Sequence, residues 1–303
     1  MPRRISSAPP INATIKLRDD RRLGYSEIGP RSGNAVLYVH GNPGSRKEML
    51  RPSYVEAIEQ AGLRVIAIDR PGYGDSDPPL TRGHHPFVED ARELMDHLKV
   101  KQGVAVGHSR GTLPAISLGV LLPDRIKAVG VFGPTGLPDD PDLLRAQSKE
   151  GRLMLSLVKR VPAGARAMFR INRWVDERFS GGAVTRMARF ISSEADRKQL
   201  REKGPEFVAA IAEGMRRDPA FAIDDWRSWL VDPLGFDPTA ITVPLLVWIG
   251  VEDGLCPPQL ARSMAARINK ATVRELLGVG HFHTPELLVE LMRSTIAKSA
   301  TSD

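Results

Sequence analysis

The spacing of hydrophobic positions changes several times along the chain and separates strand-like from helix-like segments. Two short alternating runs, 14–18 and 23–28, flank a polar stretch and predict an antiparallel hairpin at a sheet edge. Compact apolar runs then predict buried strands over residues 35–39, 64–68, 103–106 and 128–132. Helix-like segments follow the first three of these runs, over residues 46–61, 86–99 and 112–122. This alternation is typical of a parallel sheet with helical crossovers.

The pattern changes over residues 134–242, where amphipathic helical segments follow one another without a strand-like run. Strand-like and helix-like patterns return at 244–249, 258–268, 272–277 and 285–297. We therefore expect an α/β core formed by residues 1–133 and 243–303. The expected core is a mostly parallel central sheet flanked by helices, and residues 134–242 form a helical insertion.

Composition supports one large folded unit and excludes a fully disordered chain. The 303 residues are 42% hydrophobic, enough for a large α/β domain with an inserted smaller one. The net charge of +7 comes from basic residues interspersed with acidic ones, which favours a solvated surface over a nucleic-acid groove. Cys256 is the single cysteine, so the chain cannot form an internal disulfide. With neither a membrane span nor a signal-like apolar region, we expect a cytoplasmic protein, whose oligomeric state the sequence leaves open.

The candidate chemistry begins with the segment Gly107-His108-Ser109-Arg110-Gly111, which lies between a predicted strand and a predicted helix. This G-x-S-x-G pattern places a serine on a sharp strand-to-helix turn, and the flanking glycines avoid side-chain clashes there. A serine hydroxyl needs a base, and the base needs a carboxylate to orient it. Asp253 follows the predicted strand 244–249 and His281 follows the strand 272–277, so both lie at strand ends.

Together, four ordered motifs resemble those of the α/β-hydrolase superfamily. His40-Gly41-Asn42-Pro43-Gly44 resembles the oxyanion-hole loop, and the segment 69–76 resembles the loop after the next strand. The elbow at Ser109 and the order Ser, Asp, His complete the similarity, which covers nearly the whole chain. The helical insertion resembles that family's cap.

The resemblance implies a role for each matching residue. Ser109 is the expected nucleophile, Asp253 the acid and His281 the general base. The backbone N–H groups of Asn42 and Arg110 form the expected oxyanion hole. This chemistry requires no metal and no organic cofactor.

Neighbouring residues offer alternatives for two of these roles. His283 lies two residues after His281, but the Gly-His-Phe match favours His281 and leaves His283 as a surface or pocket-rim side chain. Glu252 precedes Asp253, and the resemblance favours Asp253, with Glu252 solvated.

Three other residues with reactive side chains receive structural roles. His40 and His108 are expected to be structural partners within their loops. Cys256 is expected to be a small packed side chain, since no histidine context of its own surrounds it.

Arg110 is the most individual position of the elbow. The pattern Gly-His-x-Arg-Gly also resembles the elbow of haloacid-type dehalogenases, where an aspartate is the nucleophile and the arginine holds a carboxylate. Ser109 in place of aspartate argues against dehalogenation and epoxide opening, which need a carboxylate nucleophile, and favours acyl transfer. The Arg110 side chain is predicted either to form a structural ion pair or to steer an anionic part of the substrate.

The predicted function is therefore hydrolysis of a carboxylic ester or related acyl bond of a small to medium, partly apolar molecule. Lactone opening, hydrolytic C–C cleavage, amide or iminopeptide hydrolysis and perhydrolysis use the same triad and remain open. A ligand-binding protein without catalysis is the alternative of another class. Aromatic residues of the predicted cap are expected mostly in its core, with a minority lining a pocket over Ser109. These are Phe169, Trp174, Phe179, Trp226 and Trp229.

Overall fold

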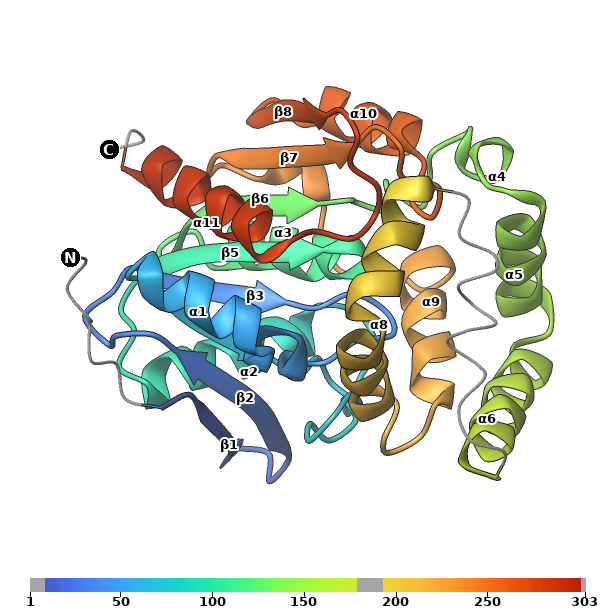
Figure 1. Cartoon of the computed structure of the whole chain (residues 1–303), viewed down its shortest axis with the longest axis horizontal. Coiled ribbons are helices and arrows are strands. Elements are labelled where there is room, and N and C mark those ends of the chain that lie inside the picture. The colour runs from blue at the N-terminus through green and yellow to red at the C-terminus, as the bar shows by residue number, and fades with distance from the viewer. Residues whose placement is uncertain (1–8, 179–192, 301–303) are drawn as a thin grey trace.

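A central sheet organises the protein, whose computed structural model describes residues 9–178 and 193–300 (Figure 1). In these residues eight strands form one sheet in the order β1-β2-β4-β3-β5-β6-β7-β8. The antiparallel pairs are β1 with β2 and β2 with β4, and the remaining neighbours are parallel. The strands are β1 (Ile11–Lys16), β2 (Arg22–Ile28), β3 (Ala35–Val39), β4 (Arg64–Ile68), β5 (Gly103–His108), β6 (Ile126–Phe132), β7 (Leu245–Gly250) and β8 (Ala271–Leu276). The predicted α/β fold with an edge hairpin is confirmed.

Helices cover both faces of the sheet and bury its apolar strands. They include η1 (Arg46–Leu50), α1 (Pro52–Gln60), α2 (His85–His97), η2 (Ser109–Gly111), α3 (Thr112–Leu121), α10 (Pro258–Ala266) and α11 (Pro285–Ser299). In β3, Val36 and Tyr38 join the core under α1 and α11, whereas Leu37 and Val39 join the core under α2, α3 and α10. Because successive side chains of a strand point to opposite faces, a continuous apolar run fits a sheet covered on both sides.

A group of helices lies between β6 and β7 in the sequence, and we call it the inserted helices. They are α4 (Leu143–Ala146), α5 (Lys149–Arg160), α6 (Pro162–Arg178), α8 (Glu194–Gly214) and α9 (Ala220–Leu230), followed by the short η3 (Pro238–Ala240). Figure 1 shows them gathered at the carboxyl ends of β3, β5, β6 and β7. In α/β sheets this is the edge at which ligands bind, so the inserted helices stand over the expected site.

The helix predicted over residues 46–61 is the clearest local error of the sequence analysis. The structure has η1 and α1 there, separated at Arg51, whose backbone is extended with φ −63° and ψ 137°. The ring of Pro52 disfavours the helical conformation of the residue before it, so one continuous helix cannot form.

The aromatic residues expected in the core of the inserted helices divide into several groups. Trp229 is buried and Phe169 and Trp226 are partly buried, whereas Trp174 is 60% exposed. Phe179 lies outside the described residues. Across the described parts of the chain, no helix is both long and apolar enough to cross a membrane.

Candidate active site

The backbone at Ser109 has the strained geometry that the elbow motif predicts. β5 ends at His108, and Ser109 begins η2 with φ +53°, in the left-handed region that residues with a side chain rarely adopt. A Cβ on Gly107 would lie 2.4 Å from the carbonyl oxygen of Gly111, and one on Gly111 would lie 2.2 Å from that of Val39. Glycine is therefore required on both sides of the serine for the turn to pack.

The three residues predicted as a triad lie together at the carboxyl edge of the sheet. His281 Nε2 is 3.0 Å from Ser109 Oγ, and His281 Nδ1 is 2.8 Å from Asp253 Oδ2. All three residues are 5–6% exposed. An imidazole that donates from Nδ1 to a carboxylate presents the lone pair of Nε2 to the serine hydroxyl, as a general base requires.

The Asp253 carboxylate is fixed by its own loop. Its Oδ1 accepts the backbone N–H groups of Leu255 at 2.9 Å and Cys256 at 2.7 Å, which leaves Oδ2 for His281. Gly133, directly after β6, lies against this pair with φ +54°. A Cβ there would lie 3.1 Å from Asp253 Oδ2 and 3.3 Å from His281 Nδ1, so a glycine makes room for the acid and the base.

The surroundings of His281 change the pKa of its imidazole. Burial alone would lower the pKa of this imidazole, but the Asp253 carboxylate and the adjacent Cys256 raise it well above its usual 6.5. Cys256 is buried, as predicted for a packed side chain, and its Sγ is 3.9 Å from Ser109 Oγ. The imidazolium formed when the base takes a proton is therefore stabilised.

The predicted oxyanion loop passes close to the serine. A Cβ on Gly41 would lie 3.2 Å from Ser109 Cβ, so the loop after β3 approaches the nucleophile at that residue. The Asn42 side chain points away toward α9, where its Nδ2 donates to Ala222 O and to Asp225 Oδ2, both at 2.8 Å. This arrangement leaves the Asn42 backbone N–H, and not its side chain, as the candidate donor to an oxyanion.

The Arg110 side chain is buried beneath α9. Its guanidinium lies 4.5 Å from the ring centre of Trp229 and 4.9 Å from that of Trp226, and Nη2 donates to the backbone oxygen of Asp225 at 2.7 Å. Burial lowers the pKa of Arg110 to about 10, against the opposing attraction of Asp225. These contacts join Arg110 to α9 and are aromatic and carbonyl contacts in place of an ion pair. Steering of an anionic part of the substrate by Arg110 stays a prediction.

Sequence reasoning missed Asp225 of α9, which connects the inserted helices to the predicted oxyanion loop. Its carboxylate accepts two bonds from Arg70, at 2.6 and 3.0 Å, one from Tyr73 at 3.1 Å and one from Asn42. Burial would raise the pKa of Asp225, but Arg70 and Arg110 hold it well below its usual value. No motif surrounds Asp225, and it lies 183 positions after Asn42, so no local pattern signals the contact.

Sequence reasoning also missed Asp196 of α8. This residue bonds the segment 277–284 between β8 and α11, which carries His281 and which we call the histidine loop. Its carboxylate oxygens accept the backbone N–H groups of His281 and Phe282, each at 2.9 Å, and Asp196 is fully buried. A Cβ on Gly280 would lie 2.4 Å from this carboxylate, so the loop approaches it closely. The sequence offers one weak signal, the N-cap Ser193, which marks the start of α8 without indicating its partner.

The structure also places the alternatives to the triad residues and the histidine of the loop after β3. Glu252 is exposed, in agreement with its predicted solvated role. The prediction of a surface position for His283 is wrong, because this residue is 4% exposed and Tyr54 and His108 pack against it. The alternative of a pocket-rim position agrees with the structure, because His283 lines a cavity of about 160 Å³. His40 is fully buried and bonds within its own loop and to the backbone N–H of Arg70, as a structural partner does.

Within residues 9–178 and 193–300, two groups of three side chains have the donor atoms and spacing to hold a metal ion. One is Asp253, Cys256 and His281, of which Asp253 and His281 are engaged with each other and with Ser109. The other is Glu48, His108 and His283, which lies outside the triad.

A family profile and several curated proteins match this chain. The profile described as alpha/beta hydrolase fold matches residues 34–284. Mouse bifunctional epoxide hydrolase 2 is 34% identical over 132 residues, which are 43% of this chain and 23% of that protein. The matched segments span only 23–31% of the length of the first five curated relatives. A 2-hydroxy-6-oxononadienedioate/2-hydroxy-6-oxononatrienedioate hydrolase of Cupriavidus pinatubonensis is 26% identical, with 89% of this chain and 88% of that protein covered.

Solved structures with the same fold include enzymes of different activities. An esterase of Thermogutta terrifontis has a TM-score of 0.64 at 20% identity, with 97% of both chains covered. The epoxide hydrolase CorEH has a TM-score of 0.70 at 18% identity, with 97% of this chain and all of that chain covered. Since the family profile covers residues 34–284, most of the chain, the chain belongs to the α/β hydrolase family.

Proposed function

We propose that the protein is a serine hydrolase that cleaves a carboxylic ester or a related acyl bond. The observation that carries the proposal is the position of His281, whose two ring nitrogens contact Ser109 Oγ at 3.0 Å and Asp253 Oδ2 at 2.8 Å. A serine, a base within hydrogen-bonding reach and an orienting carboxylate are the parts that nucleophilic acyl transfer needs.

In the proposed reaction Ser109 Oγ attacks the substrate carbonyl while His281 Nε2 takes its proton. The oxyanion forms opposite the elbow, where the backbone N–H groups of Asn42 and Arg110 are the proposed donors. His281 then gives the proton to the leaving alcohol, and an acyl group remains on Ser109. Water, deprotonated by His281, releases the acid and regenerates the serine.

The inserted helices fit the role of a cap over this site. Ser109 is 6% exposed, so a substrate reaches it beneath the cap and not from open solvent. Trp226 and Trp229 of α9 pack around Arg110, the residue next to the nucleophile. Apolar side chains near the nucleophile support a small to medium, partly apolar acyl substrate.

Several relatives are epoxide hydrolases by name, yet the nucleophile position argues for acyl chemistry here. Epoxide opening through an ester intermediate needs a carboxylate nucleophile, and this chain has Ser109 at the elbow. The serine ether that would form instead has no acyl carbon for water to attack. Ester hydrolysis is therefore the better-supported reaction.

A second candidate is hydrolysis of an oxo-dicarboxylic acid. The Cupriavidus pinatubonensis relative, matched along nearly its whole length, is named for such substrates. Arg110 is a cation beside the nucleophile, and its Nε is buried with no bond partner in the described structure. Its other contacts to α9 favour a structural role, so this candidate ranks second.

A substrate panel tests both candidates. Wild type and the Ser109→Ala variant are assayed with p-nitrophenyl esters of increasing acyl length, lactones, amides, an aryl epoxide and a 2-hydroxy-6-oxo-dienedioic acid. Ser117→Ala is the matched control, because Ser117 is a buried serine of α3 whose hydroxyl bonds Pro114 O. We expect wild type and Ser117→Ala to cleave short or medium esters, and Ser109→Ala to lose about 10³-fold or more of that rate. Turnover of the epoxide alone, or equal ester hydrolysis by Ser109→Ala, would refute the proposal.

A further inference from the structure

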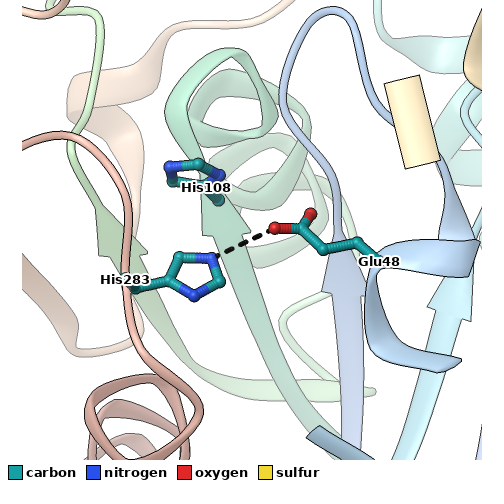
Figure 2. Close-up of side chains that lie close together, drawn as sticks. All are labelled: Glu48, His108 and His283. Atoms are coloured by element: carbon teal, nitrogen blue, oxygen red, sulfur yellow. Dashed lines mark ion pairs between the residues drawn. The ribbon is translucent and has the colours of Figure 1, made fainter. Parts of the chain in front are cut away.

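A cluster of three buried side chains behind the triad has no part in the proposed hydrolysis. Glu48 comes from η1, His108 from the end of β5 and His283 from the loop before α11. Their donor atoms lie within 4.8 Å of one another, and all three residues are at most 6% exposed. In Figure 2 His283 and Glu48 point toward one another, with His108 beside them at the end of its strand.

Hydrogen bonds leave a lone pair on each histidine that is suited to a metal. His108 Nε2 donates to the backbone oxygen of His281 at 3.0 Å, so a neutral His108 has its lone pair on Nδ1. The Tyr54 hydroxyl donates to His283 O at 2.8 Å and therefore accepts from His283 Nδ1 at 2.9 Å. The lone pair of His283 is then on Nε2, a buried atom without a hydrogen-bond partner.

The Glu48 carboxylate is also oriented by its neighbours. Glu48 Oε2 accepts the Tyr38 hydroxyl at 2.7 Å, and Oε1 faces His283 Nε2 at 3.5 Å. Oε1 and the lone pair of His283 Nε2 are two acceptors that face each other, and they repel unless a proton or a cation lies between them. Histidine ligands of metals commonly donate their second ring N–H to a carbonyl or similar acceptor, as both histidines do here.

We propose that Glu48, His108 and His283 bind a divalent first-row metal ion of the Zn²⁺ type. Ligand bonds of about 2.1 Å place neighbouring tetrahedral ligands about 3.4 Å apart, close to the separation of His283 Nε2 and Glu48 Oε1. The donor atoms lie within 4.8 Å of one another, so the most distant pair approaches by at most about 1.4 Å when the ion binds. Two imidazoles and one carboxylate form a donor set that zinc favours.

A cavity of about 160 Å³ supplies the remaining coordination position and a route of entry. Glu48, His108 and His283 line it, together with Gln199 and Phe282. The bound ion therefore has three protein ligands and an open position for water, and it joins η1, the elbow strand and the histidine loop. Arg51 opposes the ion, because its Nη2 lies 3.6 Å from Glu48 Oε1.

The test is a titration of the whole protein, stripped with a chelator, with Co²⁺ and then Zn²⁺. We expect one Co²⁺ per chain, the visible absorption of a low-coordinate cobalt site and displacement by Zn²⁺, with calorimetry as a second readout. Glu48→Gln and His283→Gln should each weaken binding roughly tenfold or more. His97→Gln, at an exposed histidine of α2, should bind like wild type.

Two further variants keep the test decisive. Cys256→Ser should retain Co²⁺ binding; loss there, with binding retained in Glu48→Gln, would move the ion to the triad cluster and overturn the proposal. Arg51→Gln should bind Co²⁺ roughly tenfold more tightly, since a nearby cation is removed. Absence of saturable binding in wild type overturns the proposal regardless of how the variants fold. None of these readouts depends on hydrolytic activity.

Discussion

Among single residues, His281 determines how the proposed reaction responds to pH. The base must be neutral to take a proton from Ser109, whereas its surroundings raise its pKa well above 6.5. We therefore expect the acid limb of kcat/KM to fall at a pH above 6.5, with activity lost as pH decreases through the raised value. A pH–rate profile on the best ester of the panel measures this limb. A limb at or below pH 6.5 would mean that Asp253 does not stabilise the imidazolium.

Gly133 offers a test of triad geometry that leaves all triad residues in place. In Gly133→Ala the new methyl lies 3.1 Å from Asp253 Oδ2, so the acid and the base must shift. We expect kcat to fall roughly tenfold or more, with a smaller change in KM.

Gly62→Ala is the matched control for the backbone strain that alanine introduces at position 133. Gly62 also has a positive φ, +65°, but nothing lies within 4 Å of its Cβ position. Both variants should lose about 1 kcal/mol of stability from left-handed strain, measured by denaturant unfolding. Equal kcat values for the two variants would show that Gly133 serves the backbone alone.

At the scale of elements, α9 is joined to the core by the partly buried carboxylate of Asp225. Asp225→Asn removes the negative charge from Arg70 and Arg110 and should lower the free energy of unfolding at pH 7 by about 3 kcal/mol. The folded-state pKa of Asp225 is below 3.8, so its stabilisation is present above that pH and is lost as pH falls further. The difference between wild type and variant should therefore shrink below about pH 4.

The control for this prediction is Asp232→Asn, which breaks a pair with the exposed Arg82. It should cost less than about 1 kcal/mol, as surface pairs do. Urea unfolding at several pH values gives both results. A loss for Asp225→Asn no greater than that of the control would contradict the assigned role of Asp225.

Helix α8 contacts the site through Asp196, which bonds the histidine loop. Asp196→Asn leaves one of two backbone N–H groups without a carboxylate acceptor, so His281 loses part of its support. We expect kcat to fall roughly tenfold with KM nearly unchanged, because the base is displaced and the substrate contacts are not. Glu194→Gln, two residues earlier in α8 and paired with Arg201 on the surface, should leave kcat as in wild type. A change confined to thermal stability would leave Asp196 a purely structural residue.

Over the whole molecule, the sequence predicts the sheet well because its strands are local patterns. The runs 35–39 and 64–68 are apolar on both faces, and β3 and β4 occupy those residues. The triad candidates could also be predicted, since Ser109 and Asp253 follow the buried strands β5 and β7 and His281 follows the edge strand β8. Parallel strands end at one edge of the sheet.

Contacts that depend on tertiary packing could not be predicted from the sequence. Glu48 and His283 lie 235 positions apart, and no periodicity within η1 or the histidine loop signals that they face each other. Asp196 and Asp225 lie in a region where amphipathic patterns predict helices. Those patterns do not show which loops the two side chains contact. The sequence thus predicts the fold and the candidate catalytic residues, whereas the residues that hold them in place become apparent only in three dimensions.

The most direct test of the central claim is covalent labelling of the folded protein with a small fluorophosphonate probe. Ser109 should carry one probe per chain, identified by mass spectrometry of its peptide, and labelling should persist in Ser117→Ala. Ser109→Ala should show none, because no other serine has His281 within hydrogen-bonding reach in the described structure. Unlabelled wild type, or equal labelling of Ser109→Ala, would contradict the assignment of Ser109 as an activated nucleophile.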